Sequence, residues 1–166
     1  MARKPNVKDK TSEVSTENTD IKPELQPHKE ADITHEILRE GKALKLSPKS
    51  TNHVFYEIAI HNEENELYIR MSGNEGGGLH SKEWVPLKDI FAVLDVQGDK
   101  PFKSSVMKCV FSGQSANNAG FMCGVCRGMG LIIKSEKSVF LHVLAPDYEQ
   151  RRDELLSLMV AGAKPE

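Results

Sequence analysis

The sequence predicts a protein of the α+β class, because strand-like and helix-like segments follow one another in groups along its 166 residues. Two β-branched and aromatic runs, 53–60 and 66–73, flank a short polar turn. A helical stripe of apolar residues begins at Leu87, and two further extended runs lie within 131–144. Together these segments predict a single α+β domain over residues 51–162.

The first 30 residues differ in composition from the rest of the chain. They are rich in Lys, Glu, Thr, Asp and Pro and hold few large aliphatic residues, so they predict a disordered tail. No run approaches the roughly 20 apolar residues of a membrane span, and no apolar region follows the positive charges at the start. Three cysteines are too few for a secreted disulfide framework. We therefore expect a cytoplasmic protein without a membrane segment.

The segments before Trp84 predict a helix and then a β-hairpin. In 31–50, apolar residues recur at helical spacing and Gly41 stands as a stop signal, which predicts a short amphipathic helix and a linker. The runs 53–60 and 66–73 predict an antiparallel hairpin around a turn that contains two Asn. The glycine-rich stretch 73–79 lacks the Lys of a phosphate-binding loop, which favours a flexible connector.

Two helices are predicted next. After Pro86, which suits a first helical turn, four apolar residues mark one buried side: Leu87, Ile90, Phe91 and Leu94. We expect Trp84, just before this helix, to be a core anchor. The apolar run 103–113 fits a helical turn or a buried strand, and the Ser residues at its start and Gly113 at its end favour a short helix.

Three further elements complete the predicted domain. Ser115 is placed to cap a third helix, which Gly130 ends. The run 131–144 predicts two strands around the turn KSEK. Asp147, with a Gln three residues later, predicts a last helix over 147–161 through a capping box.

From residue 82 to 144 the predicted order is therefore helix, short helix, helix and two-stranded hairpin. This order resembles the winged helix-turn-helix, in which the third helix is offered to a DNA groove and the hairpin is the wing. The resemblance rests on element order alone and on no signature motif. It implies a winged-helix-like domain that binds nucleic acid through the start of its third helix.

Two of the three cysteines stand in the spacing C-G-V-C, at Cys123 and Cys126. On a helical wheel Cys126 lies near the middle of the apolar arc and Cys123 at its edge, which favours buried structural thiols. A redox dithiol would sit at a helix start, where the helix dipole lowers its pKa, whereas this predicted helix starts two turns earlier. Zinc would need two further ligands, for which the candidates are Cys109, His80 and His142. Thiol redox chemistry and zinc binding remain the alternatives.

On the other face of the same predicted helix, Gly120, Gly124 and Gly128 recur every four residues. Each glycine inside a helix costs about 1 kcal/mol of helix stability relative to alanine, so we expect the absence of side chains here to provide a compensating contribution. We predict that something packs closely against this face. Another helix, from this chain or from a second copy in a homodimer, is one option, and a nucleic-acid backbone is the other.

Polar side chains at the start of this helix are candidates for contacts with bases and phosphates: Gln114, Ser115, Asn117 and Asn118. The alternative is a capped helix start with solvated Asn residues. Arg127 is the one basic residue on this helix, so further phosphate contacts would come from nearby lysines. These are Lys103, Lys108, Lys134 and Lys137. Segment 82–144 holds 8 basic and 5 acidic residues, which mildly favours an anionic partner there.

Catalytic motifs are not apparent, because the chain lacks a nucleophile elbow, an H-E-x-x-H motif and a phosphate loop. We expect neither an enzyme nor a bound cofactor. Our first hypothesis is a nucleic-acid-binding accessory or regulatory protein. The second is a protein–protein interaction module, an adaptor or inhibitor, that docks through the glycine-lined helix face and the acidic segment 51–81. A thiol redox or zinc protein is the third.

Overall fold

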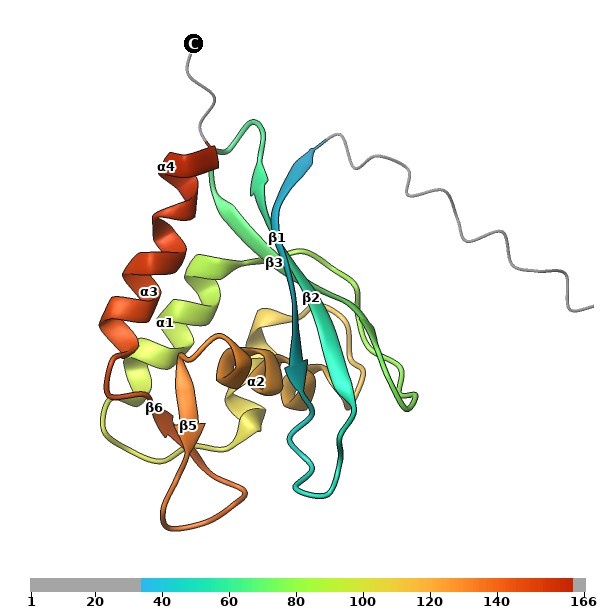
Figure 1. Cartoon of the computed structure of the whole chain (residues 1–166), viewed down its shortest axis with the longest axis vertical. Coiled ribbons are helices and arrows are strands. Elements are labelled where there is room, and N and C mark those ends of the chain that lie inside the picture. Colours follow the sequence, from blue (N-terminus) through green and yellow to red (C-terminus); the bar gives the residue numbers. More distant parts are fainter. Residues whose placement is uncertain (1–33, 163–166) are drawn as a thin grey trace, which may run out of the picture. The chain divides into compact units, whose positions relative to one another are not determined.

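Residues 34–162 are described by a computed structural model, and the predicted tail over the first 30 residues lies outside them. The structure confirms the α+β class, because an antiparallel sheet comes first and helices and a small second sheet follow (Figure 1). The large sheet holds, in spatial order, β1 (His35–Leu44), β2 (His53–His61), β3 (Leu67–Asn74) and β4 (Val85–Pro86). The remaining elements are α1 (Leu87–Gln97), the 3₁₀ helix η1 (Ser104–Val110), α2 (Asn118–Gly128), β5 (Ile132–Lys134), β6 (His142–Leu144), α3 (Tyr148–Leu156) and α4 (Leu158–Gly162).

Strands β2 and β3 confirm the predicted hairpin. Successive residues of a strand point to opposite faces, so Val54 and Ile58 of β2 share the core face with Ile69 of β3. These three side chains are fully buried. On the other face, the Arg70 guanidinium donates to the Glu57 carboxylate over 2.7 Å.

Helix α1 also follows the prediction, since its buried residues are the four that the apolar stripe marks. The expectation that Trp84 anchors the core is wrong. Val85, the next residue along, is fully buried, and strand alternation therefore turns Trp84 to the opposite side. There its half-buried ring stacks on His35 at 4.6 Å between ring centroids, and the Arg70 guanidinium lies 4.3 Å from the ring centroid.

The short helix predicted within 31–50 is also wrong, because residues 35–44 form β1 and pair with β2. A register shift between Ile37 and Arg39 interrupts the alternation that would have marked a strand. Further along, the residues on the core face are small: Tyr56 covers Gly41 across the strand pair, and Ala43 is buried. Within the described residues, the sheet therefore begins before residue 51, with β1.

The later elements appear in the predicted order, with changes at their boundaries. Residues 104–110 are helical, as a 3₁₀ helix, and β5 pairs with β6 as the predicted hairpin. The predicted Ser115 cap is wrong, because α2 begins at Asn118. Asp147 does stand at the N-cap position of α3, as predicted, but its carboxylate accepts a hydrogen bond from Arg151 and makes no capping hydrogen bond. The winged-helix resemblance is not confirmed, because a four-stranded sheet precedes these elements and one of the three helices is a 3₁₀ helix.

The helices lie together on one side of the large sheet (Figure 1). Helix α1 packs against β3 and β4, and α2 packs against β1 and β2. Helix α3 is tied to α1 through Tyr148, whose hydroxyl donates to the Asp95 carboxylate over 2.7 Å. Within the described part of the chain, no helix combines the length and the apolar character needed to cross a membrane.

Candidate functional site

The glycine face of α2 lies against β1. A Cβ atom built on Gly124 would stand 3.0 Å from the carbonyl oxygen of Leu44, and one built on Gly128 would stand 2.5 Å from the Cβ of Ala43. Both distances are too short for an ordinary contact, whereas a Cβ on Gly120 would meet nothing within 4 Å. Two of the three glycines therefore provide close packing, and their partner is a strand of this chain.

This packing covers part of a sheet edge. The Lys45 N–H donates to the Asn52 carbonyl over 2.9 Å. Peptide groups of an antiparallel ladder alternate in direction, so those of Lys42 and Leu44 point away from β2. The Lys42 and Leu44 carbonyls are the backbone oxygens that lie nearest to the glycines of α2. Helix α2 thus shields the end of an edge strand that would otherwise be open to pairing with another chain.

Three of the four polar side chains predicted to contact nucleic acid form hydrogen bonds within the protein. Asn118 is buried, accepts a hydrogen bond from the Ser81 N–H over 2.7 Å and donates to the Gly113 carbonyl over 3.1 Å. The Asn117 amide and the Ser115 hydroxyl both donate to the Leu79 carbonyl, over 2.9 and 2.6 Å. These side chains hold the connector before β4 against the start of α2. Gln114, the fourth, is exposed.

The C-G-V-C thiols are both buried, as the helical wheel predicts. Burial raises the pKa of Cys123 to about 11 and raises that of Cys126 well above its usual range. Both groups are therefore neutral thiols near pH 7 and poor nucleophiles. Cys109 is exposed on η1. Nowhere in residues 34–162 do three His, Cys, Asp or Glu side chains gather as metal ligands would.

Arg127 is held by a buried histidine. Its Nε–H donates to His142 Nδ1 over 3.1 Å, so the ring proton of the neutral imidazole is on Nε2, 2.8 Å from the Ser104 hydroxyl. Burial and then the charge of Arg127 lower the pKa of His142 to about 4. His142 is 1% exposed, and it joins β6, η1 and α2. The buried Nη2 of Arg127 has no hydrogen-bond partner among the described residues.

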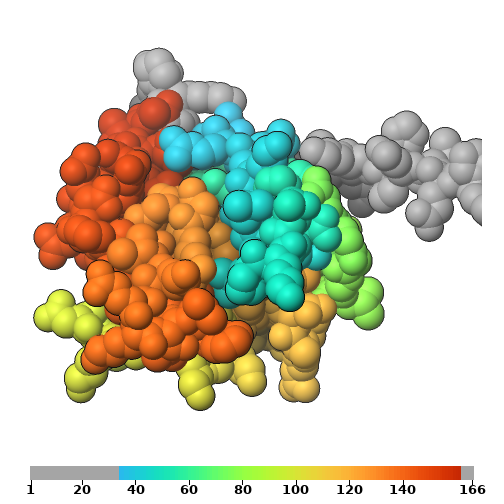
Figure 2. Space-filling model, turned by 60° about the horizontal axis from the view of Figure 1, so that its bottom comes forward, coloured from blue at the N-terminus to red at the C-terminus, as the bar shows by residue number. Residues whose placement is uncertain are grey.

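A groove of about 640 Å³ opens beside this arginine, and we call it the basic groove. One wall is the end of β1 with the turn after it, residues 42–48 and Ser50, together with His53 of β2. Gly124, Arg127 and Gly128 of α2 line it further in, and Lys134 and Val139 of the β5–β6 hairpin form the other wall. Figure 2 shows these walls, in teal and orange, next to one another on one face of the molecule.

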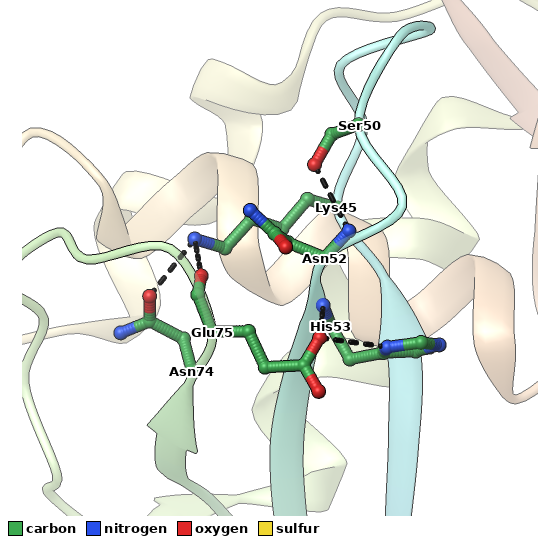
Figure 3. Close-up of polar contacts among 6 residues, drawn as sticks. All are labelled: Lys45, Ser50, Asn52, His53, Asn74 and Glu75. Carbon is green, nitrogen blue, oxygen red and sulfur yellow. Dashed lines mark hydrogen bonds and ion pairs between the residues drawn. The ribbon is translucent and has the colours of Figure 1, made fainter.

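Four of the residues that line the basic groove are Lys or Arg: Lys42, Lys45, Arg127 and Lys134. Lys45 is already engaged, because its ammonium donates to Asn74 Oδ1 over 2.8 Å and to the backbone carbonyl of Glu75 (Figure 3). It also donates to the Gly77 carbonyl over 3.0 Å. His53 is also engaged, since its N–H and Nδ1 both contact the Glu75 carboxylate. Lys42 and Lys134 are exposed and Arg127 is half-buried. These two lysines and the Arg127 guanidinium, whose Nε–H already donates to His142, are the remaining cations of the lining.

The basic groove brings together some of the predicted residues and omits others. Arg127, Lys134, Gly124 and Gly128 line it, whereas the other predicted residues do not. The latter are Lys103, Lys108, Lys137, Gly120, Gln114, Ser115, Asn117 and Asn118. Sequence reasoning missed Lys42 and Lys45, because it assigned their segment to a helix and linker. A signal was present, since the stretch 41–56 contains three lysines and no acidic residue.

The chain was also compared with protein-family models, with curated proteins and with solved structures, and none of them matches it.

Proposed function

We propose that this protein is a non-enzymatic accessory protein that binds nucleic acid through phosphate contacts in the basic groove. The observation that carries the proposal is the lining of the groove. As described over residues 34–162, this lining includes four Lys or Arg residues and no Asp or Glu. The whole chain, by contrast, has a net charge of −2. Positive charge is therefore concentrated in a concave site, where it attracts an anion most strongly.

Phosphate oxygens fit the chemistry of these cations. Lysine ammonium groups bind phosphate as compact charges, and an arginine guanidinium offers several N–H donors. Arg127 and the glycines lie at the end of α2, where the partial negative charge of the helix opposes an anion. Most of the attraction must then come from Lys42 and Lys134 on the two walls. So few contacts give weak binding that falls steeply with salt, and a homodimer would double their number.

Fluorescence anisotropy of labelled DNA at about 50 mM and about 200 mM salt tests the proposal. We expect Lys42→Glu and Lys134→Glu each to lower the affinity several-fold and to reduce the salt slope by about one. Lys103→Glu and Lys108→Glu are the matched controls, because both lysines are exposed and neither lines the groove. These controls should bind as the unchanged protein does.

Two results would overturn the proposal. The first is no binding of any DNA by the unchanged protein at micromolar concentration. The second is an equal loss of affinity in all four lysine variants, which would show attraction to general surface charge rather than binding in the groove.

A further inference from the structure

The apolar part of the basic groove indicates which form of nucleic acid fits it. Besides its cations, the groove is lined by Leu44, Leu46, Pro48 and Val139. Leu44 is 57% exposed and Val139 45% exposed, so a ligand can reach both side chains. Apolar side chains contribute nothing to phosphate binding, whereas unpaired bases gain from contact with them.

An exposed aromatic residue directly follows one of these lining residues in the sequence. Phe140 follows Val139 in the turn between β5 and β6, and it is 77% exposed. Its backbone N–H is held by the Ser138 hydroxyl over 3.2 Å, and the Ser135 N–H donates to the Leu141 carbonyl at the base of the turn. The turn therefore presents Phe140 from a hydrogen-bonded frame. Among the described residues, Phe140 belongs neither to the hydrophobic core nor to the side chains packed against it.

We propose that the basic groove binds single-stranded rather than double-stranded nucleic acid, with Lys42, Arg127 and Lys134 on the phosphates and Phe140 stacked on a base. This inference rests on the proposed function and specifies its ligand. Proteins that bind single strands combine a positive groove with aromatic side chains, because every base has a flat face that can stack. In a duplex the base faces are stacked on one another and unavailable to Phe140, and the phosphates lie on a convex surface, which a groove of about 640 Å³ cannot enclose.

The test compares a labelled oligonucleotide of about 12 nucleotides, a typical site size, with a duplex of the same length at matched salt. We expect tighter binding of the single strand. Phe140→Ala should lower its affinity about tenfold and leave duplex binding unchanged. Phe140→Tyr keeps the ring and should retain the affinity. Val96→Ala is the matched control, because Val96 is also a largely exposed apolar residue, at 83%, and lies on α1 outside the groove.

The outcomes separate this inference from the proposed function. Equal affinity for the two probes, or no effect of Phe140→Ala, would overturn single-strand binding, while loss of affinity in Lys42→Glu would still support nucleic-acid binding in the groove. Displacement of DNA by polyglutamate at equal charge would also overturn the inference, because the groove would then bind any polyanion through its charge, without a contribution from base stacking. Failure to bind either probe overturns the proposed function itself.

Discussion

The two ends of α2 use their side chains in opposite ways. At its start, the side chains of Asn117 and Asn118 form hydrogen bonds with the backbone of the connector and of the loop that precedes the helix. At its end, Arg127 and the bare backbone at Gly128 line a groove that Lys42 reaches from a distant strand. The polar side chains at the start of α2 thus form hydrogen bonds within the protein, whereas cations that are far apart in sequence meet at a surface groove. Three changes test this contrast.

Acidification should weaken the end of α2 through His142. Its pKa is about 4 in the folded protein and 6.5 in its ordinary state, so the unfolded chain takes up the proton first as the pH falls. The His142 contribution to stability is complete above about pH 6.5 and declines towards pH 4, by up to about 3 kcal/mol in the free energy of unfolding. Urea denaturation at about pH 7 and about pH 4.5 measures this loss.

The control for this loss is His142→Gln, which does not titrate. Its amide oxygen can still accept the Arg127 N–H, so the variant isolates the effect of protonation. We expect a smaller difference in stability between the two pH values than in the unchanged protein. An identical pH dependence would show that carboxyl groups elsewhere, and not His142, control acid stability.

A methyl group on the packed part of α2 should have the next largest effect. Gly128→Ala places a Cβ 2.5 Å from the Cβ of Ala43, so β1 and α2 must move apart, and we expect the free energy of unfolding to fall by about 2 kcal/mol. Gly120→Ala is the matched control, because its Cβ meets nothing. There the better helix propensity of alanine should raise stability by about 0.5 to 1 kcal/mol. Chemical denaturation gives both values, and equal signs would contradict the assigned packing.

The smallest change concerns the start of α2. Asn118→Ala leaves the Ser81 N–H and the Gly113 carbonyl without their buried partner, and we expect a loss of about 1.5 kcal/mol in the free energy of unfolding. Asn117→Ala removes one hydrogen bond of a half-buried side chain and should cost about 0.5 kcal/mol. If Asn118→Ala instead preserved stability and abolished DNA binding, the helix start would be the nucleic-acid interface after all.

Much of the fold could be predicted from the sequence, because its signals are local. The hairpin of β2 and β3, the buried stripe of α1 and the β5–β6 hairpin each follow from residues a few positions apart. Strand β1 could not, since its register shift and its small core-facing residues hide a strand pattern. Because β1 was not predicted as a strand, it also could not be identified from the sequence as the element that packs against the glycine face of α2.

The candidate site was harder to predict because it is assembled from distant segments. Arg127 and Lys134 were identified from their own neighbourhood, but only the fold brings Lys42 next to them. The polar residues at the start of α2 looked like ligand-binding groups because sequence does not show what they bond to. Their partners Leu79, Ser81 and Gly113 lie in the connector and in the loop before the helix.

The covering of β1 by α2 has a consequence for biosynthesis. The edge of β1 around Leu44 leaves the ribosome long before Gly128, which later packs against that end of the strand. At about 5 to 20 residues per second, the nascent chain carries this edge unshielded for several seconds. During that interval a neighbouring nascent chain can pair with the uncovered edge. Crowding on polysomes, or slow translation between Leu44 and Gly128, should therefore increase misassembly of newly made chains, whereas the finished domain, with this edge covered, is protected.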